Sequence, residues 1–178
     1  MNRVLLIVLL FCGCLCSCSK SNDVAAQVQS QAAIDDKIIT DYLKANGLPV
    51  NNVDTISTTT GVAAPSGVCY IVDTLGTGSN LLTSSTQITV GYTGRILTTG
   101  GVLGAVFAQT NNFHPSFVLG QVIRGWQLGL SKSKIQKGGV VRLYIPSRYA
   151  YGPYPQQTIG LPANAVLFFS IKLYNITN

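Results

Sequence analysis

The chain is organised around the stretch Phe117-Val-Leu-Gly-Gln-Val-Ile-Arg-Gly-Trp126-Gln-Leu-Gly129, which holds the only tryptophan of the protein. Phe117 and Leu119 alternate toward one face, as in a half-buried strand. The glycines that follow end this strand, and the pattern predicts a single helical turn from Trp126 to Leu130. Trp126 is then either the floor of an apolar pocket or the largest core residue. Residue type alone favours the core, because buried aromatic residues are common and pockets are few.

Three further motifs lie around this stretch in a fixed order. The sequence VGYTG spans Val90–Gly94 upstream, AYG spans Ala150–Gly152 and LPAN spans Leu161–Asn164 downstream. In this order and at these spacings the motifs resemble those of the FKBP-type peptidyl-prolyl cis-trans isomerases. That family shows V-x-Y-T-G, then F-x-L-G and V-I-x-G-W, then A-Y-G, then I-P-x-N. The resemblance covers roughly residues 66–178, and several motifs in register are far more specific than any one of them.

The resemblance implies an α+β fold in which a twisted antiparallel β-sheet of five or six strands wraps around one short α-helix. The alternation of apolar residues agrees with a mainly β chain. It predicts strands over Val68–Val72, Gln87–Leu97, Gly138–Pro146 and Val166–Ile176. Within the second of these, Tyr92 shares the inward face with aliphatic residues, where its hydroxyl needs a partner. That position suits a pocket wall better than plain core, although both remain open.

The resemblance also implies a pocket that binds Xaa-Pro segments of polypeptides, that could also admit macrolide ligands, and that needs no cofactor or metal. The residues that match the family's pocket positions are Tyr92, Phe107, Val122, Ile123, Trp126, Tyr151, Leu161 and Phe169. The backbone N–H of Ile123 and the hydroxyl of Tyr151 are expected to hold the carbonyl groups of the substrate.

The sequence departs from the family's pattern at several pocket positions. Phe107 fits the family's F-D pair and puts Ala108 in place of the aspartate, while Leu103-Gly104 offers a rival alignment that also lacks the carboxylate. Pro115 replaces a pocket aromatic, for which Phe113 is a candidate substitute. The loop of residues 153–158, expected to form a flap, contains no histidine.

The residue inventory excludes most bond-breaking chemistry in the region of resemblance. His114 is its only histidine and Asp73 its only carboxylate side chain, so Ser/His/Asp catalysis, metal sites and paired carboxylates are not expected. An enzyme built from such residues must act on conformation. Prolyl amide rotation is such a reaction, since its barrier of ~18–20 kcal/mol comes from resonance rather than from a bond to be cleaved. The rival readings are a proline-segment-binding chaperone without turnover and a structural protein of the cell envelope.

The formal charge of +6 is unevenly distributed, because no glutamate is present and eight basic residues follow Thr74. These residues are scattered, and only Lys132, Lys134 and Lys137 cluster. Nucleic-acid binding is therefore not expected.

The N-terminus is typical of a bacterial lipoprotein. Residues 1–17 combine a positive start with an apolar run too short to span a membrane. Leu15-Cys-Ser-Cys18 resembles a lipobox, so we expect Cys18 to carry the lipid, with Cys14 as the weaker candidate. The protein is then anchored in the bacterial cell envelope, at the outer membrane or on the periplasmic face. Cys69 is the cysteine that remains for the domain, where it is expected to be a small buried residue.

Residues 18–33 are small and polar and predict a flexible tether, and residues 34–65 predict a short helix with an extended lead-in to the domain at 66–178. Apolar residues recur at helical spacing over positions 34–43. Asp35 and Asp36 would lie in the first turn of this helix, and Asn46-Gly47 would end it. Whether the helix docks on the domain or mediates dimers stays open at this point.

Overall fold

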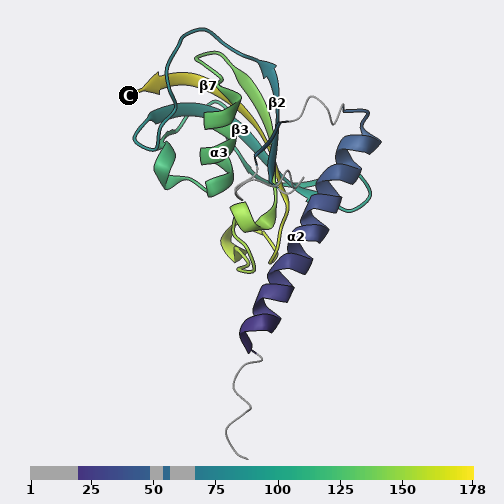
Figure 1. The fold of residues 1–178 in the computed structure, drawn as a ribbon. Coiled ribbons are helices and arrows are strands. Elements are labelled where there is room, and N and C mark those ends of the chain that lie inside the picture. Colours follow the sequence, from purple (N-terminus) through teal and green to yellow (C-terminus); the bar gives the residue numbers. More distant parts are fainter. Residues whose placement is uncertain (1–19, 49–53, 57–66) are drawn as a thin grey trace, which may run out of the picture. The chain divides into compact units, whose positions relative to one another are not determined.

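The computed structural model describes residues 20–48, 54–56 and 67–178 (Figure 1). The predicted signal peptide and Cys18 lie outside these residues. The chain divides into two compact units, Met1–Gln31 and Ala32–Asn178. The described part of the first unit is the beginning of helix α2, and the second unit contains the rest of α2 and the whole sheet. No helix in the described part of the chain is both long enough and apolar enough to cross a membrane.

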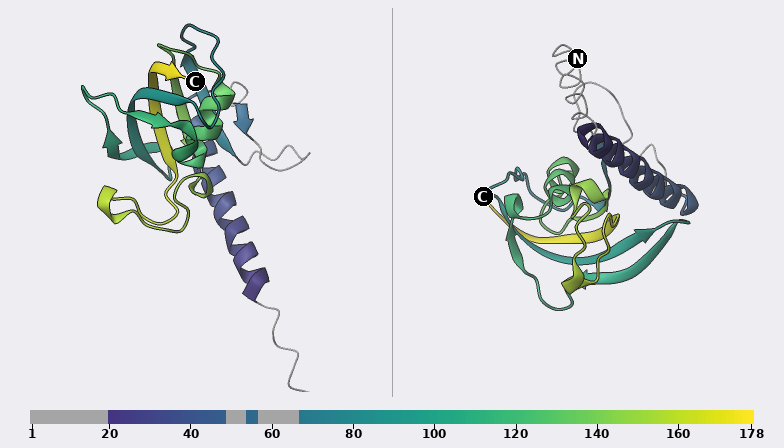
Figure 2. Two further views of the ribbon diagram at one scale, coloured as in Figure 1. Left: turned by 90° about the vertical axis from the view of Figure 1, so that its left-hand side faces the viewer. Right: turned by 90° about the horizontal axis from the view of Figure 1, so that it is seen from below.

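The second unit is an antiparallel sheet that curves around one short helix, α3 (Figure 2). The strand order is β1-β2-β6-β7-β3-β4, and β5 pairs with β3 beside this path. The elements are α2 Lys20–Ala45, β1 Asp54–Ile56, β2 Val68–Thr74, β3 Gln87–Thr98, β4 Val102–Gln109, β5 Ser116–Val118, α3 Arg124–Ser133, β6 Val140–Ile145 and β7 Leu167–Thr177. Short 3-10 helices lie at Leu119–Gln121 (η2), Ser147–Tyr149 (η3) and Gln157–Ile159 (η4). The predicted fold class is confirmed, and the three-residue strands β1 and β5 bring the sheet to seven strands.

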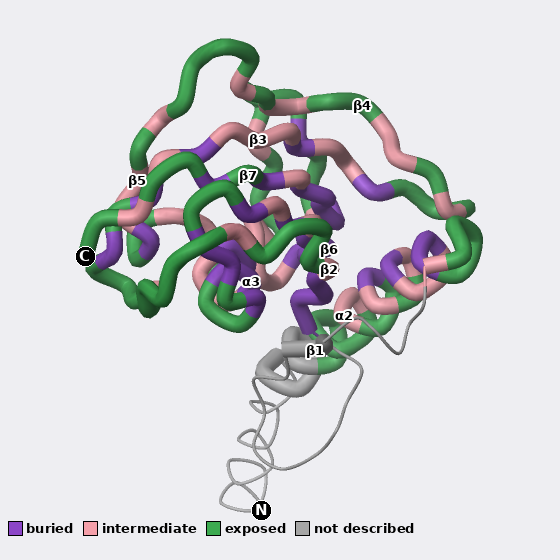
Figure 3. Tube along the Cα trace, turned by 90° about the horizontal axis from the view of Figure 1, so that it is seen from above, coloured by how far each residue is buried: buried purple, intermediate pink, exposed green. Residues whose placement is uncertain are grey.

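The main core lies between α3 and the concave face of the sheet (Figure 3). Strand β3 contributes Ile88 and Val90, both fully buried, in the alternation that the sequence predicts. Helix α3 comes unusually close to the sheet at Gly125. A Cβ atom there would lie 2.4 Å from Cγ2 of Ile145 on β6. The helix is longer than the single turn predicted from Trp126, because it begins at Arg124 and continues to Ser133.

A second cluster covers the opposite face of the sheet. Ile39, Tyr42 and Leu43 of α2 pack there against residues of several strands. The other buried members of this outer cluster are the strand residues Cys69, Leu97, Tyr144 and Phe168, and Val166, which directly precedes β7. Strands buried on both faces need apolar residues at consecutive positions, and β7 accordingly begins Leu-Phe-Phe. The second half of α2 thus docks on its own domain, and the expectation that Cys69 is buried is confirmed.

Helix α2 corrects the prediction for the N-terminal region. It begins at Lys20, so residues 20–33, predicted as part of a flexible tether, are helical. The segment is small and polar, but it is also rich in alanine and glutamine, which are strong helix formers. Asp35 and Asp36 therefore lie in the middle of the helix rather than in its first turn. Gly47 ends the helical region with a positive φ of 62°, as the Asn-Gly pair predicts.

Candidate active site

A pocket of about 430 Å³ opens on the concave side of the sheet. Strands β3, β4, β5 and β7 form its walls, the start of α3 forms its floor, and the segment of residues 151–159 borders it. Its lining residues are Tyr92, Phe107, Ala108, Phe117, Gln121, Val122, Ile123, Trp126, Tyr151, Ile159 and Phe169. Among these described residues, the polar side chains are those of Gln121 and the two tyrosines. The pocket is therefore walled mainly by aromatic and aliphatic groups.

Trp126 is the centre of an aromatic cluster in this pocket. Its ring is only 4% exposed and meets Phe169 edge to face, with ring centroids 5.1 Å apart. Tyr92 approaches the same ring at 5.2 Å and Phe117 at 6.2 Å, both nearly perpendicular to it. Phe107 in turn packs against Phe169 at 5.5 Å. Edge-to-face contacts stabilise aromatic pairs, so these rings hold one another in place before any ligand arrives.

The glycine of the VGYTG motif makes this cluster possible. A Cβ atom on Gly94 would lie 2.7 Å from the Phe169 ring and 2.8 Å from the Phe107 ring. Any larger side chain at this point of β3 would push both rings out of position. In this motif Tyr92 forms part of the pocket wall, and the missing side chain of Gly94 leaves room for the rings of Phe107 and Phe169.

The groups that can donate hydrogen bonds to a ligand in the pocket include the backbone N–H of Ile123 and the hydroxyl of Tyr151. Ile123 precedes α3, and its carbonyl accepts from the N–H of Trp126 at 3.0 Å, whereas its own N–H has no hydrogen-bond partner within the described part of the chain. Tyr151 is half-buried, and burial, helped by the nearby Tyr92, raises the pKa of its hydroxyl. The Tyr151 hydroxyl therefore stays protonated, and stays a donor, well above neutral pH.

The structure brings nearly all the residues predicted from the family's motifs together around this pocket. The exception is Leu161, which is 2% exposed and belongs to the core rather than to the pocket lining. Its backbone closes the base of the 153–160 loop, because Gln156 and Leu161 exchange N–H to carbonyl bonds of 2.9 and 3.1 Å. Leu161 shapes the loop beside the pocket, and it is not among the residues that line the pocket in this structure.

Phe117, Gln121 and Ile159 line the pocket and were not identified from the sequence. For Phe117 a signal exists, since it alternates with Leu119 toward the core and lies near the VIRGW motif. Ile159 has no such signal, because its loop has no periodic pattern that fixes where a side chain points.

The fold also distinguishes between the two alignments that the sequence offers where it departs from the family's pattern. Phe107 and Ala108 line the pocket, whereas Leu103 packs with the outer cluster under α2. Irregular pairing on either side of Arg95 lets β4 carry the extra residues that this alignment needs. Phe113 is 71% exposed and absent from the pocket lining, so its predicted role as a substitute aromatic is wrong.

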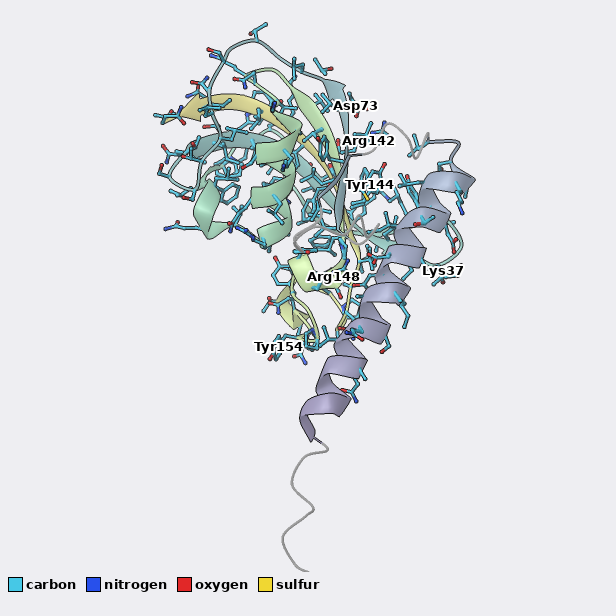
Figure 4. All side chains as sticks on the ribbon, in the orientation of Figure 1. Lys37, Asp73, Arg142, Tyr144, Arg148 and Tyr154 are labelled. Atoms are coloured by element: carbon cyan, nitrogen blue, oxygen red, sulfur yellow. The ribbon has the colours of Figure 1, made fainter. Side chains whose placement is uncertain are left out.

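No charged side chain is among the described residues that line the pocket. Asp73 of β2 pairs with Arg142 of β6 through two-pronged contacts of 2.8–3.1 Å, and Figure 4 labels both side chains. His114 stacks on Tyr174, with ring centroids 3.8 Å apart, and does not line the pocket. The described residues contain no group of three or more histidine, cysteine or acidic side chains placed to hold a metal ion.

Comparison with known proteins identifies relatives of this arrangement. Residues 78–174 match the family model "FKBP-type peptidyl-prolyl cis-trans isomerase". The isomerase FkpA of Buchnera aphidicola from Schizaphis graminum is 36% identical over 113 residues, which are 64% of this chain and 42% of that relative. FK506-binding protein 1 of Saccharomyces cerevisiae is 32% identical over 101 residues, 57% of this chain and 85% of the yeast protein. The chain spans less than half the length of the Buchnera aphidicola FkpA relatives it matches.

Solved structures show the same architecture. The Escherichia coli FkpA structure aligns with a TM-score of 0.61 and 28% identity, over 88% of this chain and 66% of that one. A peptidyl-prolyl cis-trans isomerase from Pseudomonas syringae aligns with a TM-score of 0.63 over 84% of this chain and 96% of that one. At 22% identity the second match concerns the fold alone.

Proposed function

This chain belongs to the FKBP-type peptidyl-prolyl cis-trans isomerases, and from that membership we propose that it catalyses rotation about Xaa-Pro peptide bonds in the pocket above Trp126. The observation that carries the proposal is the cluster of aromatic side chains packed around Trp126. This cluster gives the pocket an apolar surface, and no ionised side chain is among the described lining residues. The proposed substrates are proline-containing segments of secreted or envelope proteins.

The proposed mechanism depends on the environment that the pocket gives to the amide. A planar prolyl amide is polar because resonance separates charge, and this resonance is lost in the twisted form. Transfer into an aromatic pocket disfavours the planar form more than the twisted form, so the barrier falls. The N–H of Ile123 and the hydroxyl of Tyr151 would bind carbonyl groups of the substrate and fix its orientation. Uncatalysed exchange takes tens of seconds or longer, which makes such catalysis useful in folding.

Macrolide ligands are a further proposal for the same pocket. Its aromatic walls suit a large apolar ring, but Ala108 stands where the family has a carboxylate at the rim. A macrolide held here would therefore lack a hydrogen bond at that position. We propose that its affinity rests mainly on apolar contact, together with hydrogen bonds from the N–H of Ile123 and the hydroxyl of Tyr151.

The direct test is turnover by the mature protein. We expect acceleration of cis–trans exchange in a short Xaa-Pro peptide, measured by a protease-coupled assay or by NMR exchange. Binding of the peptide without acceleration would instead identify the protein as a proline-segment-binding module.

Tyr151→Phe should reduce kcat/KM by about twofold to about tenfold and leave the fold intact. The substitution keeps the ring and removes one hydrogen bond, worth about 0.5–1.5 kcal/mol. Tyr154→Phe is the matched control, because Tyr154 lies in the same loop but is 71% exposed and outside the pocket lining. Unchanged kinetics in Tyr151→Phe would remove this hydroxyl from the site.

The activity should be nearly independent of pH. Rotation of an amide needs no proton transfer, and burial keeps the pKa of Tyr151 above its usual value, so nothing in the pocket titrates near neutrality. We expect kcat/KM for an uncharged peptide to stay flat from about pH 5.5 to about pH 8.5. His114 lies outside the pocket lining. A step in the profile that disappears in His114→Ala would contradict this mechanism.

We further propose that a lipid on Cys18 anchors the protein in the cell envelope. The support is the lipobox-like approach of Leu15 to Cys18. Cys18→Ser should leave the precursor unprocessed and unlabelled by radioactive fatty acid, while Cys14→Ser should be processed normally. The reverse pattern would move the anchor to Cys14.

A further inference from the structure

Asp35 is a fully buried carboxylate of helix α2. It precedes every residue of the pocket lining by more than 50 positions in the sequence. Its Oδ2 atom accepts two hydrogen bonds from Ser147, one from the backbone N–H at 2.9 Å and one from the hydroxyl at 2.6 Å. Burial of a charge is costly unless hydrogen bonds compensate it, and bonds to an ionised group are among the strong ones. Asp35 and Ser147 therefore form a firm link between α2 and η3.

The other side of Ser147 holds the segment that carries Tyr151. The Ser147 carbonyl accepts from the N–H of Ala150 and from the N–H of Gly152, both at 2.9 Å. These two amides flank Tyr151 directly. The carbonyl of Gly152 also accepts from the N–H of Asn164 at 2.8 Å, which ties the segment to the LPAN motif. The Ser147 carbonyl thus binds the backbone on both sides of Tyr151, and Asn164 adds a second contact at Gly152.

A second contact lies beside the first and makes the same connection. Arg148 donates to Asp36 at 2.8 Å, and its guanidinium lies 5.3 Å from the centre of the Tyr149 ring. Figure 4 shows Arg148 beside α2. Two neighbouring residues of α2 therefore hold two neighbouring residues of η3.

We propose that Asp35 is a positioning residue for the pocket, which acts through Ser147 to hold the Tyr151 hydroxyl where a substrate carbonyl binds. The proposal rests on the proposed isomerase function and adds to it a role for the N-terminal helix. A small displacement of a positioning group is enough to lower a rate substantially. Loosening α2 from η3 should accordingly weaken catalysis without any change in the lining of the pocket.

The test is a double-mutant cycle on the mature chain. Asp35→Asn removes the charge that Ser147 donates to and should lower kcat/KM about threefold to tenfold. In the Tyr151→Phe background the same substitution should cost less than about twofold, because the hydroxyl it positions is already gone. Asp41→Asn is the matched control, since Asp41 lies on the same helix and pairs with Lys37 instead of the domain. Equal losses in both backgrounds would show a merely structural role and overturn the proposal.

A second readout does not depend on turnover. Asp35→Asn should speed hydrogen exchange of the Ala150 and Gly152 amides, measured by NMR, and Asp41→Asn should not. If the wild-type protein shows no isomerase activity, the proposed function fails. The same double-mutant cycle is then carried out with the affinity for a proline-containing peptide as the measured quantity. If Asp35→Asn does not fold, Ser147→Ala takes its place, because it removes one of the two donors and keeps the backbone N–H. Unchanged exchange at Ala150 and Gly152 overturns the proposal.

Discussion

Trp126→Ala should lower kcat/KM by a factor of about 100 or more and reduce the free energy of unfolding by about 3–5 kcal/mol. The side chain is 4% exposed and packs edge to face against Tyr92, Phe117 and Phe169. Its removal therefore deletes the pocket floor and frees the three rings that it holds. Its buried indole N–H has no hydrogen-bond partner among the described residues, so the loss is one of packing.

The control for this result must be a variant that lowers the free energy of unfolding but leaves the pocket lining unchanged. Leu130 lies on the same helix, is fully buried and does not line the pocket. Leu130→Ala should cost about 2–5 kcal/mol but keep kcat/KM within about twofold wherever the protein is folded. Urea unfolding and an exchange assay on the same samples separate the two effects. If Trp126→Ala does not fold, Trp126→Phe should give an intermediate loss of activity. Full activity in either folded Trp126 variant would place the active site elsewhere.

Leu43→Ala should destabilise the domain by about 2–5 kcal/mol, although Leu43 lies outside the family's motifs. Its side chain is 2% exposed and belongs to the cluster through which α2 covers the outer face of the sheet. The substitution leaves a cavity in this cluster, which also contains the fully buried Tyr144 of β6. Burial raises the pKa of Tyr144 to about 12, which reflects how little water reaches this interface.

Ile34→Ala provides the comparison for Leu43→Ala, because Ile34 lies on the same helix but is 51% exposed. We expect it to change the free energy of unfolding by less than about 0.5 kcal/mol. Denaturant titration of both variants gives the difference. Similar small effects for the two would show that the helix does not dock on the sheet in solution.

The sequence by itself determined the family, the sheet and most of the pocket. Local alternation fixed the inward face of β3, since neighbouring side chains of a strand point to opposite sides wherever the strand lies. The motifs around Tyr92, Trp126 and Tyr151 placed these residues in one pocket through their resemblance to those of the FKBP family. Alternation and motif spacing are short-range properties, which a single sequence expresses fully.

Tertiary structure alone decided the features that depend on contact between distant segments. The polar composition of residues 20–33 predicted a tether, and their helicity became clear only in the fold. Whether Leu161 or Ile159 lines the pocket is set by how their loop meets the sheet, which no local period records. The pairing of Asp35 with Ser147 joins residues 112 positions apart. Its physical basis is the compensation of a buried charge, and that demand exists only once α2 has docked and excluded water from the carboxylate.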